Sequence, residues 1–380
     1  MTPKCRSPMK KAKVATRFMT FDSSTATGIQ AVNAGSMQVG STTARVNGAG
    51  VSRTEVDGAL SFASLNIANN AGTGLTVNNT KTGTFTLTST TGTVDTTAGT
   101  ALNLDPLLIN LNFAAVSSTG AAGAGIILDN VQGAGPGGSA LNLGTLTIAN
   151  SGQQGLLITG GSTGLVTIGG GTITNSGGAS VQIGEAGVAG SGGTIGLNLG
   201  ATITDSGPGP LVSLFNTGGA IRFTGAVSGT GPIAIDGTAA GSSIVFAGNV
   251  AINGATGPAL SINNVAGTVG FTGTVTITNP TGSGILIGNS AAGSTVAFTG
   301  ATTITGAGAP ALSLNNLAGA TAFTGALSII NPAGTAIVIG AVPGGVTFGD
   351  VDITGLGAAT GLDLTGTSGN VTFATLDITG

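Results

Sequence analysis

The 380-residue chain contains no histidine, tyrosine or tryptophan, and its one cysteine is Cys5. Without histidine, the chain lacks the commonest general base and the commonest metal ligand, and a catalytic triad built on histidine is excluded. Without tyrosine and tryptophan, it lacks the larger aromatic platforms that stack on sugars and bases. One cysteine cannot form an intramolecular disulfide or a cysteine metal cluster. We therefore expect a protein that is not an enzyme and that uses no cofactor.

Charged side chains are also scarce, at 6% of the sequence. The first 20 residues hold six cations and no anion: Lys4, Arg6, Lys10, Lys11, Lys13 and Arg17. The rest of the chain holds all 13 acidic residues and only four cations, so it is mildly acidic and has no basic stripe. This balance argues against nucleic acid as a partner. We expect residues 1–20 to be a basic, disordered leader.

Long apolar runs are missing as well. No apolar stretch of signal-peptide length follows Arg17, and no stretch is long enough to span a membrane. The 71 glycines disfavour helices, since each interior glycine costs about 1 kcal/mol relative to alanine. They have no three-residue period, which excludes collagen. A mean hydropathy of +0.47 predicts a buried interior rather than disorder.

The chain does contain an internal repeat that is marked by phenylalanine. The same slot recurs about every 26 residues, and a period of this length is typical of a solenoid. Leu143, Ile168 and Leu197 fill the slot in three central repeats. Ten phenylalanines fill the others: Phe62, Phe85, Phe113, Phe223, Phe246, Phe271, Phe298, Phe323, Phe348 and Phe373.

Each repeat contains three short stretches that alternate apolar with small polar residues, as at 311–314, 321–323 and 327–329. Alternation with period two predicts strands with one buried face. Thr-Gly pairs recur after the second stretch and indicate a corner there. Two residues after the first stretch lies Asn or Gly, which indicates a left-handed backbone there. These residues are Asn79, Asn130, Asn216, Asn264, Asn289, Asn316, Gly160, Gly237 and Gly366.

The pattern predicts an all-β fold, a single-stranded right-handed parallel β-helix solenoid of about 13 coils with three short strands each. We expect the solenoid at residues 62–380 and a degenerate first coil or N-terminal cap at residues 21–61. The phenylalanine rings should point inward and stack from coil to coil. The loop between the first and second strands lengthens at 131–139 and 184–193. Such insertions gather on one side of a solenoid, where they either bind a partner or are tolerated expansions.

Two sets of outward residues are candidate binding sites. Thr-Ile-Thr triplets should present a flat threonine array, similar to the ice-binding face of antifreeze solenoids, although threonine is also a common exposed strand residue. The array consists of Thr172, Thr174, Thr202, Thr204, Thr276, Thr278, Thr303 and Thr305. Asp352 and Asp377 occupy the same slot in consecutive coils, either as a weak metal site or as a solvated acidic face that discourages strand pairing.

The coil rich in Gly, Thr and Asn with an inward phenylalanine row resembles the β-helix stalks of bacterial autotransporters and related adhesins. The resemblance covers about residues 60–380. It implies a non-enzymatic structural or adhesive stalk of an exported surface protein, located extracellularly or on the cell surface. Host surfaces, glycans or self-association through the coil ends would then be its partners. We expect the chain to be part of a longer polypeptide. The alternatives are a carbohydrate-active enzyme similar to polysaccharide lyases, and an ice-binding solenoid.

Overall fold

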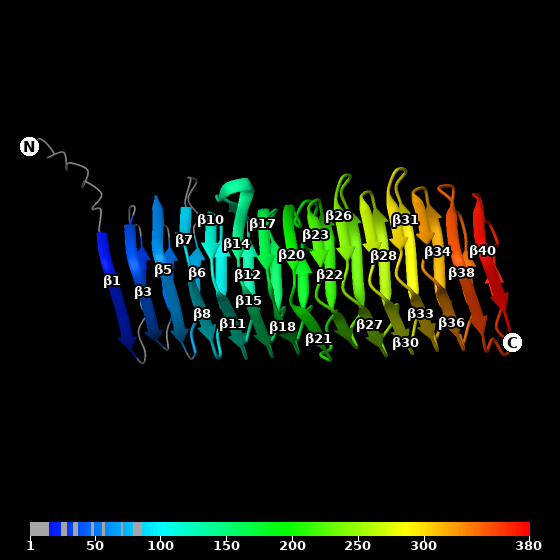
Figure 1. Ribbon diagram of the computed structural model, residues 1–380, viewed down its shortest axis with the longest axis horizontal. Helices are drawn as coiled ribbons and strands as arrows, with labels where there is room; N and C mark the ends of the chain where they lie inside the picture. Colours follow the sequence, from blue (N-terminus) through cyan, green and yellow to red (C-terminus); the bar gives the residue numbers. More distant parts are fainter. Residues whose placement is uncertain are drawn as a thin grey trace, which may run out of the picture.

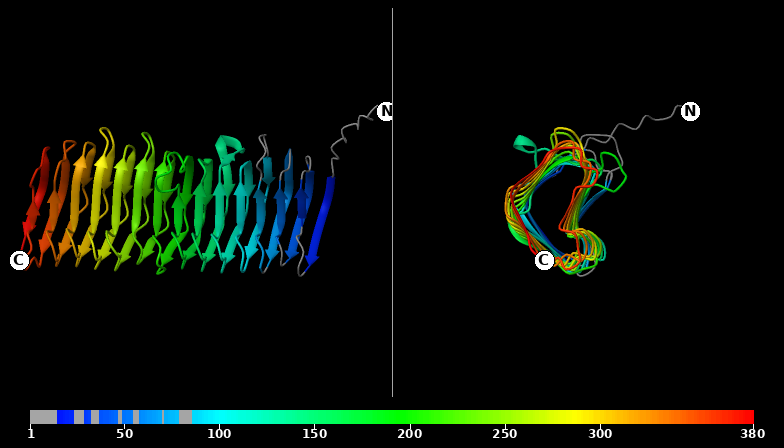
Figure 2. Two further views of the ribbon diagram at one scale, coloured as in Figure 1. Left: turned by 180° about the vertical axis from the view of Figure 1, so that it is seen from behind. Right: turned by 90° about the vertical axis from the view of Figure 1, so that its right-hand side faces the viewer.

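The computed structural model is a rod of stacked β coils, with β1 (Ala15–Ser23) and β40 (Val371–Ile378) at opposite ends (Figure 1). The structure describes residues 15–23, 29–32, 37–46, 49–54, 58–69, 71–78 and 86–380. Seen along the axis, the coils overlay in one outline (Figure 2). The predicted all-β solenoid of about 13 coils is confirmed, and its strands pair in parallel. Its right-handed sense stays a prediction.

One face of the rod is a sheet of 14 strands, one from each successive coil. Each strand pairs in parallel with its equivalent in the next coil, as Leu312 pairs with Ile337. The strands are β2 (Ile29–Val32), β4 (Val51–Thr54), β6 (Leu75–Asn78), β9 (Leu102–Asp105), β12 (Ile126–Asp129), β16 (Leu156–Thr159), β19 (Val181–Ile183), β22 (Val212–Thr217), β25 (Ile233–Thr238), β28 (Leu260–Val265), β31 (Ile285–Ser290), β34 (Leu312–Leu317), β37 (Ile337–Ile339) and β39 (Leu362–Asp363).

The second and third strands of the coils share one bent sheet of 26 strands. The second strands are β7 (Thr86–Ser89), β10 (Leu107–Asn112), β13 (Val131–Gly133), β14 (Ser139–Asn142), β17 (Thr163–Ile168), β20 (Thr194–Leu199), β23 (Ala220–Phe223), β26 (Ser243–Phe246), β29 (Thr268–Phe271), β32 (Thr295–Phe298) and β35 (Ala320–Phe323). The third strands are β8 (Gly92–Thr96), β11 (Ala115–Thr119), β15 (Thr145–Ala149), β18 (Gly170–Thr174), β21 (Thr202–Asp205), β24 (Val227–Gly229), β27 (Val250–Asn253), β30 (Val275–Thr278), β33 (Thr302–Thr305) and β36 (Leu327–Ile330).

Near both ends of the rod, the second and third strands join into one. The continuous strands are β1, β3 (Met37–Val46), β5 (Ala59–Asn69), β38 (Val346–Thr354) and β40. The prediction of three short strands in each coil is therefore wrong for these coils. In the coil of Phe348 the expected second and third stretches form one strand, β38, because Gly349 and Asp350 stay extended where the middle coils turn at Thr-Gly.

The N-terminal part takes up the coil pattern earlier than expected. We predicted a disordered leader up to residue 20, but β1 begins at Ala15 and pairs in parallel with β3 over Phe18 to Ser23. Within residues 21–61, β2 pairs with β4 and β3 pairs with β5. Only residues 19–22 of this strand alternate apolar with polar side chains, so the sequence carries little signal for its start at Ala15. The division into leader, cap and solenoid otherwise stays a prediction, because residues 1–14 lie outside the described part.

The inward phenylalanine row is confirmed from Phe223 to Phe373. Successive rings stack with centroids 4.5 to 5.4 Å apart and planes within 13° of parallel. The rings from Phe223 to Phe348 are at most 1% exposed. The row continues one coil toward the N-terminus as Leu199, so the assignment of Leu197 to this slot is wrong; Leu197 pairs with Ile221 instead.

Further toward the N-terminus the row shifts by two residues. Phe62 pairs with Ser89, and Ser89 pairs with Leu111, so Phe113 lies two positions beyond the row of Phe62. Phe85 lies outside the described residues. A shift of two preserves the inward direction of a strand residue, because side chains alternate with period two. Phe62 and Phe113 are therefore both buried although they belong to different rows.

The predicted left-handed corner after the first strand is confirmed in the described coils. Its asparagines have φ between 48° and 56°, and its glycines Gly160, Gly237 and Gly366 have φ between 66° and 79°. Asn79 lies outside the described residues. A second left-handed corner follows the third strand, with Asn150, Asn175, Asn279 and Asn331 at φ of 48° to 55°. We did not predict this corner.

In the third face the strands pair residue by residue throughout, but at one step the apolar pattern moves by two residues along the strand. Ile203 of β21 pairs with Val227, whereas Asp205 pairs with Gly229 and Gly229 with Ile252. The buried isoleucines of the C-terminal coils therefore continue the row of Asp205 rather than that of Ile203. We call this step between β21 and β24 the register junction. The last corner of the coil moves by two residues there, although the rod continues without interruption.

Asp205 is a buried carboxylate at the register junction, 3% exposed. Its Oδ2 accepts hydrogen bonds from the amide of Ser176 at 2.9 Å and from the hydroxyl of Ser180 at 2.5 Å. Its Oδ1 accepts from the amide of Gly207 at 2.7 Å. Buried polar groups need partners, so one carboxylate here satisfies donors of two consecutive coils.

Candidate functional site

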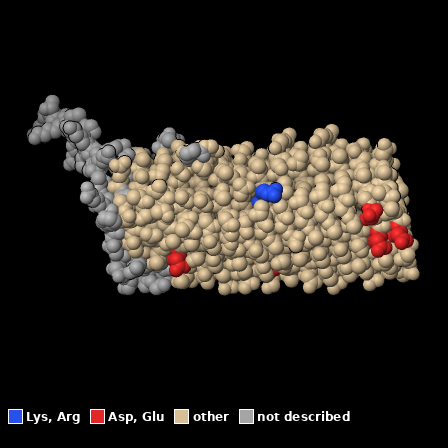
Figure 3. All heavy atoms as spheres, in the orientation of Figure 1, with Lys and Arg blue, Asp and Glu red and all other residues tan. Residues whose placement is uncertain are grey.

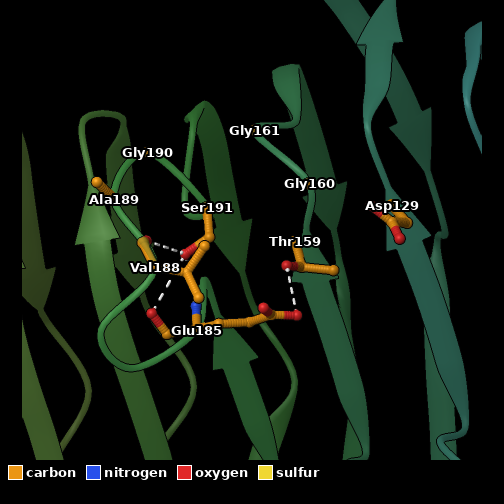
Figure 4. A pocket seen from close by; sticks show the side chains of 9 residues that line it. All are labelled: Asp129, Thr159, Gly160, Gly161, Glu185, Val188, Ala189, Gly190 and Ser191. Carbon is orange, nitrogen blue, oxygen red and sulfur yellow. Dashed lines mark hydrogen bonds between the residues drawn. The ribbon is translucent and has the colours of Figure 1, made fainter.

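One of the two longer loops is confirmed between first and second strands: the loop at 184–193 connects β19 to β20. The expectation is wrong for 131–139, because β13 already pairs with β10 in the second face, and residues 134–138 with the short helix η1 (Pro136–Gly138) interrupt the second strand between β13 and β14. A hollow of about 410 Å³ lies beside the loop at 184–193. Figure 4 shows the residues that line it: Asp129, Thr159, Gly160, Gly161, Glu185, Val188, Ala189, Gly190 and Ser191. We call it the acidic hollow.

Hydrogen bonds hold the loop beside the acidic hollow in one shape. The hydroxyl of Ser191 accepts from the amide of Glu185 at 2.7 Å and donates to the carbonyl of Val188 at 2.8 Å. The side-chain amide of Asn216, one coil on, donates to the same carbonyl at 2.9 Å. Glycines at every third position, from 184 to 193, have φ of 58° to 74° and allow successive tight turns. Val188 is thereby presented at the surface, 47% exposed.

The two carboxylates of the acidic hollow come from different coils. Asp129 ends β12, and its pairing partner Thr159 ends β16. The hydroxyl of Thr159 donates to Oε1 of Glu185 at 3.2 Å, so Thr159 lies between the two acids (Figure 4). Burial raises the pKa of Asp129, and the negative charge of Glu185 raises it further. Burial and the charge of Asp129 raise the pKa of Asp105 in the same way.

We did not predict these acids as a group, although the sequence carries a signal for them. The strands at 102–105 and 126–129 both end in Leu-Asp, 24 residues apart, which is one coil. Acids at equal positions of consecutive coils lie close together. Glu185 stands two residues after the strand at 181–183, where other coils have Asn or Gly, so its position does not mark it as one of an acidic group. Chemically, the hollow offers two carboxylates, of which Asp129 has a raised pKa, and hydroxyl donors, without a cation in its lining.

The eight predicted threonines form four cross-coil pairs: Thr172 with Thr202, Thr174 with Thr204, Thr276 with Thr303, and Thr278 with Thr305. The isoleucine inside each triplet is buried, and every threonine is exposed or half-exposed, as predicted from alternation. Each pair of triplets therefore forms a small outward lattice two coils tall.

The four triplets form two separate lattices, because the coils at 227–229 and 251–253 carry no Thr-Ile-Thr triplet. The row of Thr204 runs through Ser228 and Ala251 to Thr276, which opens its own triplet. The N-terminal triplets are thus offset by two residues from the C-terminal ones, because the register junction lies between them. Small residues at Ser228, Gly229 and Ala251 leave a shallow hollow of about 360 Å³ between the two lattices.

The predicted neighbours Asp352 and Asp377 do pair across the last two coils and are both exposed. Next to them, the hydroxyl of Thr375 donates to Asp350 at 2.9 Å. Figure 3 shows acidic side chains gathered at this end of an otherwise nearly uncharged face. Within the described part of the chain, no three His, Cys, Asp or Glu side chains are grouped so that they could hold a metal ion.

One cation lies inside the rod, against the usual rule for charged residues. Arg53 of β4 is 1% exposed and lies in a row between Ala31 and Val77. Its Nη2 donates to the carbonyl of Gly58 at 3.0 Å. Burial lowers its pKa to about 9. Period-two alternation places Arg53 inward with its neighbours, so the sequence did contain this signal, but we had counted it only among the body cations. Arg222, by contrast, is exposed.

The chain was also compared with the requirements of a membrane-spanning helix and with known proteins. No helical segment in the described ranges has the length and apolar character needed to cross a bilayer. Comparisons with protein-family models, curated proteins and solved structures find no match to this chain.

Proposed function

We propose that the protein is a non-enzymatic structural or adhesive stalk of an exported bacterial surface protein. The observation that carries the proposal is the unbroken stack of parallel coils around one continuous core. A solenoid in which each coil contacts only its neighbours holds its two ends at a fixed separation. Export and an extracellular or cell-surface location rest on the resemblance to autotransporter stalks.

The surface chemistry supports a presenting role more than a catalytic one. The chain has no histidine, and only 6% of its residues are charged. Its outer rows consist mostly of hydroxyls and amides, as in the threonine lattices and the Asn corners. Such a surface can form many weak contacts with a glycan or a host surface while the rod stays soluble. No nucleic acid partner is proposed, because the body has no basic stripe.

A distance measurement tests the stalk directly. Thr174 and Ser328 lie in one outward row, six coils apart, so their Cα atoms should be about 29 Å apart. We expect spin labels on Thr174→Cys and Ser328→Cys, in a Cys5→Ser background, to give one narrow distance distribution by electron paramagnetic resonance. The same labels in denaturant provide the broad control. A broad distribution in native buffer would rule out a rigid spacer.

The acidic hollow is the observation that favours a second candidate, a carbohydrate-active enzyme. Paired carboxylates can cleave glycosidic bonds when one of them stays protonated, and the pKa of Asp129 is raised. The test is incubation of the protein with a panel of neutral and acidic polysaccharides. Cleavage that is lost in both Asp129→Asn and Glu185→Gln, and kept in Asp236→Asn, would replace the stalk proposal with this one.

A further inference from the structure

We propose that a second hollow, on the other side of the loop at 184–193 from the acidic hollow, binds one neutral sugar unit of a glycan. The inference deepens the adhesive part of the proposed function and rests on it. The loop contributes Gly187 and Ala189 to the lining, and three consecutive coils contribute Phe215, Asp236 and Asn264. The hollow measures about 350 Å³, within the range of small-ligand pockets. We call it the aromatic hollow.

Phe215 is an aromatic side chain in an outward row of otherwise polar or small residues. It follows the buried Leu214 in β22, so alternation turns it outward, and it is half-buried. In the same row of the next three coils stand Asp236, Asn263 and Gly288. The other phenylalanines whose side chains the structure describes belong to inward rows. An outward ring among polar neighbours offers a flat apolar face to a ligand.

Two polar groups beside Phe215 have hydrogen-bonding capacity for a ligand. Asp236 is the pairing partner of Phe215, so its carboxylate lies one strand away from the ring. Its Oδ1 accepts a hydrogen bond from Nδ2 of Asn264 at 2.6 Å. Among the described residues, Oδ2 of Asp236 and the second hydrogen of this amide have no protein partner. A carboxylate oxygen accepts from one hydroxyl and an amide hydrogen donates to the next, which matches adjacent hydroxyls of a sugar ring.

The wall of the aromatic hollow is held in place without a ligand. Gly184 begins the loop directly against β22, where a Cβ would lie 2.0 Å from the carbonyl oxygen of Phe215. The side-chain amide of Asn216 donates to the carbonyl of Val188, in the middle of the loop, at 2.9 Å. A site whose walls are already ordered loses less conformational entropy on binding, which favours a small ligand such as one sugar unit.

Charge limits the class of sugar. Among the described residues that line the aromatic hollow, Asp236 is the one acid and there is no cation. An acidic sugar would be repelled, and a phosphate would find no positive partner. A neutral hexose offers a face of C–H groups to Phe215 and adjacent hydroxyls to Asp236 and Asn264. The occupant is therefore a neutral hexose unit.

Saturation-transfer NMR of the full-length protein with methyl glucoside, methyl galactoside and methyl mannoside tests the site. We expect transfer to at least one of them, and weaker binding of methyl glucuronide because Asp236 repels its carboxylate. Phe215→Ala and Asp236→Ala should each raise the Kd about tenfold. Phe215→Leu keeps the apolar bulk without the flat ring, and Asp236→Asn keeps one acceptor oxygen, so each should raise the Kd only about threefold.

Matched controls separate binding from damage to the fold. Asn315→Ala removes an outward amide from the same row, three coils beyond Asp236, and should leave the Kd unchanged. Asp129→Asn, in the acidic hollow, should also leave it unchanged. Circular dichroism should show the same strand content for every variant.

Three results would overturn the inference: no transfer to any of the three hexosides, tighter binding of the glucuronide, or an unchanged Kd in Phe215→Ala. Loss of binding in Asp129→Asn would also overturn it, because the sugar would then lie in the acidic hollow. The spin-label distance tests the stalk separately. A narrow distance without sugar binding would overturn this site and leave the stalk proposal standing.

Discussion

Glycine at the second corner of the coil is required by the spacing of the coils, and not by backbone handedness. A Cβ on Gly248, Gly273, Gly300 or Gly325 would lie 2.1 to 2.3 Å from the carbonyl oxygen of the equivalent residue one coil back. None of these glycines has a positive φ. Strands at the fixed spacing of a parallel sheet leave no room for a side chain where the backbone turns inward. The Asn corners differ, because there the backbone itself is left-handed.

Gly273→Ala should therefore lower the free energy of unfolding by about 1–3 kcal/mol, since its methyl group would meet the backbone of Gly248 at 2.3 Å. The measurement is chemical denaturation of purified variants. Gly270→Ala in the same coil is the matched control, because a Cβ there meets nothing within 4 Å. That control should be neutral or up to about 1 kcal/mol more stable. Equal effects of the two changes would contradict the steric explanation.

At the scale of a strand, the ends of β9 and β12 place two acids in one row, with Glu185 following in the loop after β19. Burial raises the pKa values of Asp105 and Asp129, and a neighbouring negative charge raises each further, that of Asp129 for Asp105 and that of Glu185 for Asp129. A carboxyl whose pKa is raised by folding favours the folded state while it is protonated. This contribution is complete below the ordinary pKa of 3.8 and is lost as the pH rises through the raised value. The acidic row therefore costs stability at neutral pH.

Asp129→Asn should make the rod more stable at neutral pH and should have little effect below pH 3.8, where the natural side chain is already protonated. The expected result is a flatter dependence of the melting temperature on pH. The matched control is Asp236→Asn, which removes an acid from the same row beyond Phe215 and keeps an acceptor for Asn264. An unchanged pH dependence in Asp129→Asn, or the same flattening in the control, would contradict the prediction.

Across the whole molecule, the register junction divides one rod into two blocks of coils. On the C-terminal side, stacked phenylalanines and isoleucines fill the core. On the N-terminal side, buried hydroxyls lie in or directly after the third strands, as at Thr96, Ser118 and Ser176. Asp205, the last residue of β21, accepts hydrogen bonds from Ser176 and Ser180 of the preceding coil and from Gly207 of its own coil, directly before the step. In a solenoid, stability is roughly a sum over coils and their interfaces, so a weak interface can separate two units.

Asp205→Ala should split the unfolding of the rod into two transitions. It leaves the buried amide of Ser176 and the hydroxyl of Ser180 without this acceptor, at about 1–3 kcal/mol for each. We expect calorimetry to resolve a second peak, and hydrogen exchange to show earlier opening of residues 86–205 than of residues 220–354. Asp95→Ala, at an exposed acid, is the control. One unshifted transition in Asp205→Ala would show that the junction is not a boundary.

The sequence predicted the site less well than the fold, for a physical reason. The fold follows from alternation and corner residues, which are visible over a few neighbouring residues, and from a repeat of about 26 residues, which is visible along the sequence without knowledge of contacts. The acidic hollow joins Asp129 to Glu185, which are two coils apart, and depends on the shape of the loop between them. Each threonine triplet could be recognised in the sequence by itself. The alignment of the triplets depends on the register junction, where they move by two residues along the strands while the same faces stay outward.

The sequence by itself determined the parallel coil, its approximate number of repeats, the left-handed first corner and the inward row from Phe223 to Phe373. These are local properties, set by period-two alternation and by the residues that tolerate a turn. Only the tertiary structure decided where the triplets move along the strands, which strands run unbroken, and which donors satisfy the buried Asp205. Register is a relation between coils, and a shift of two residues preserves the alternation on which the sequence prediction depends.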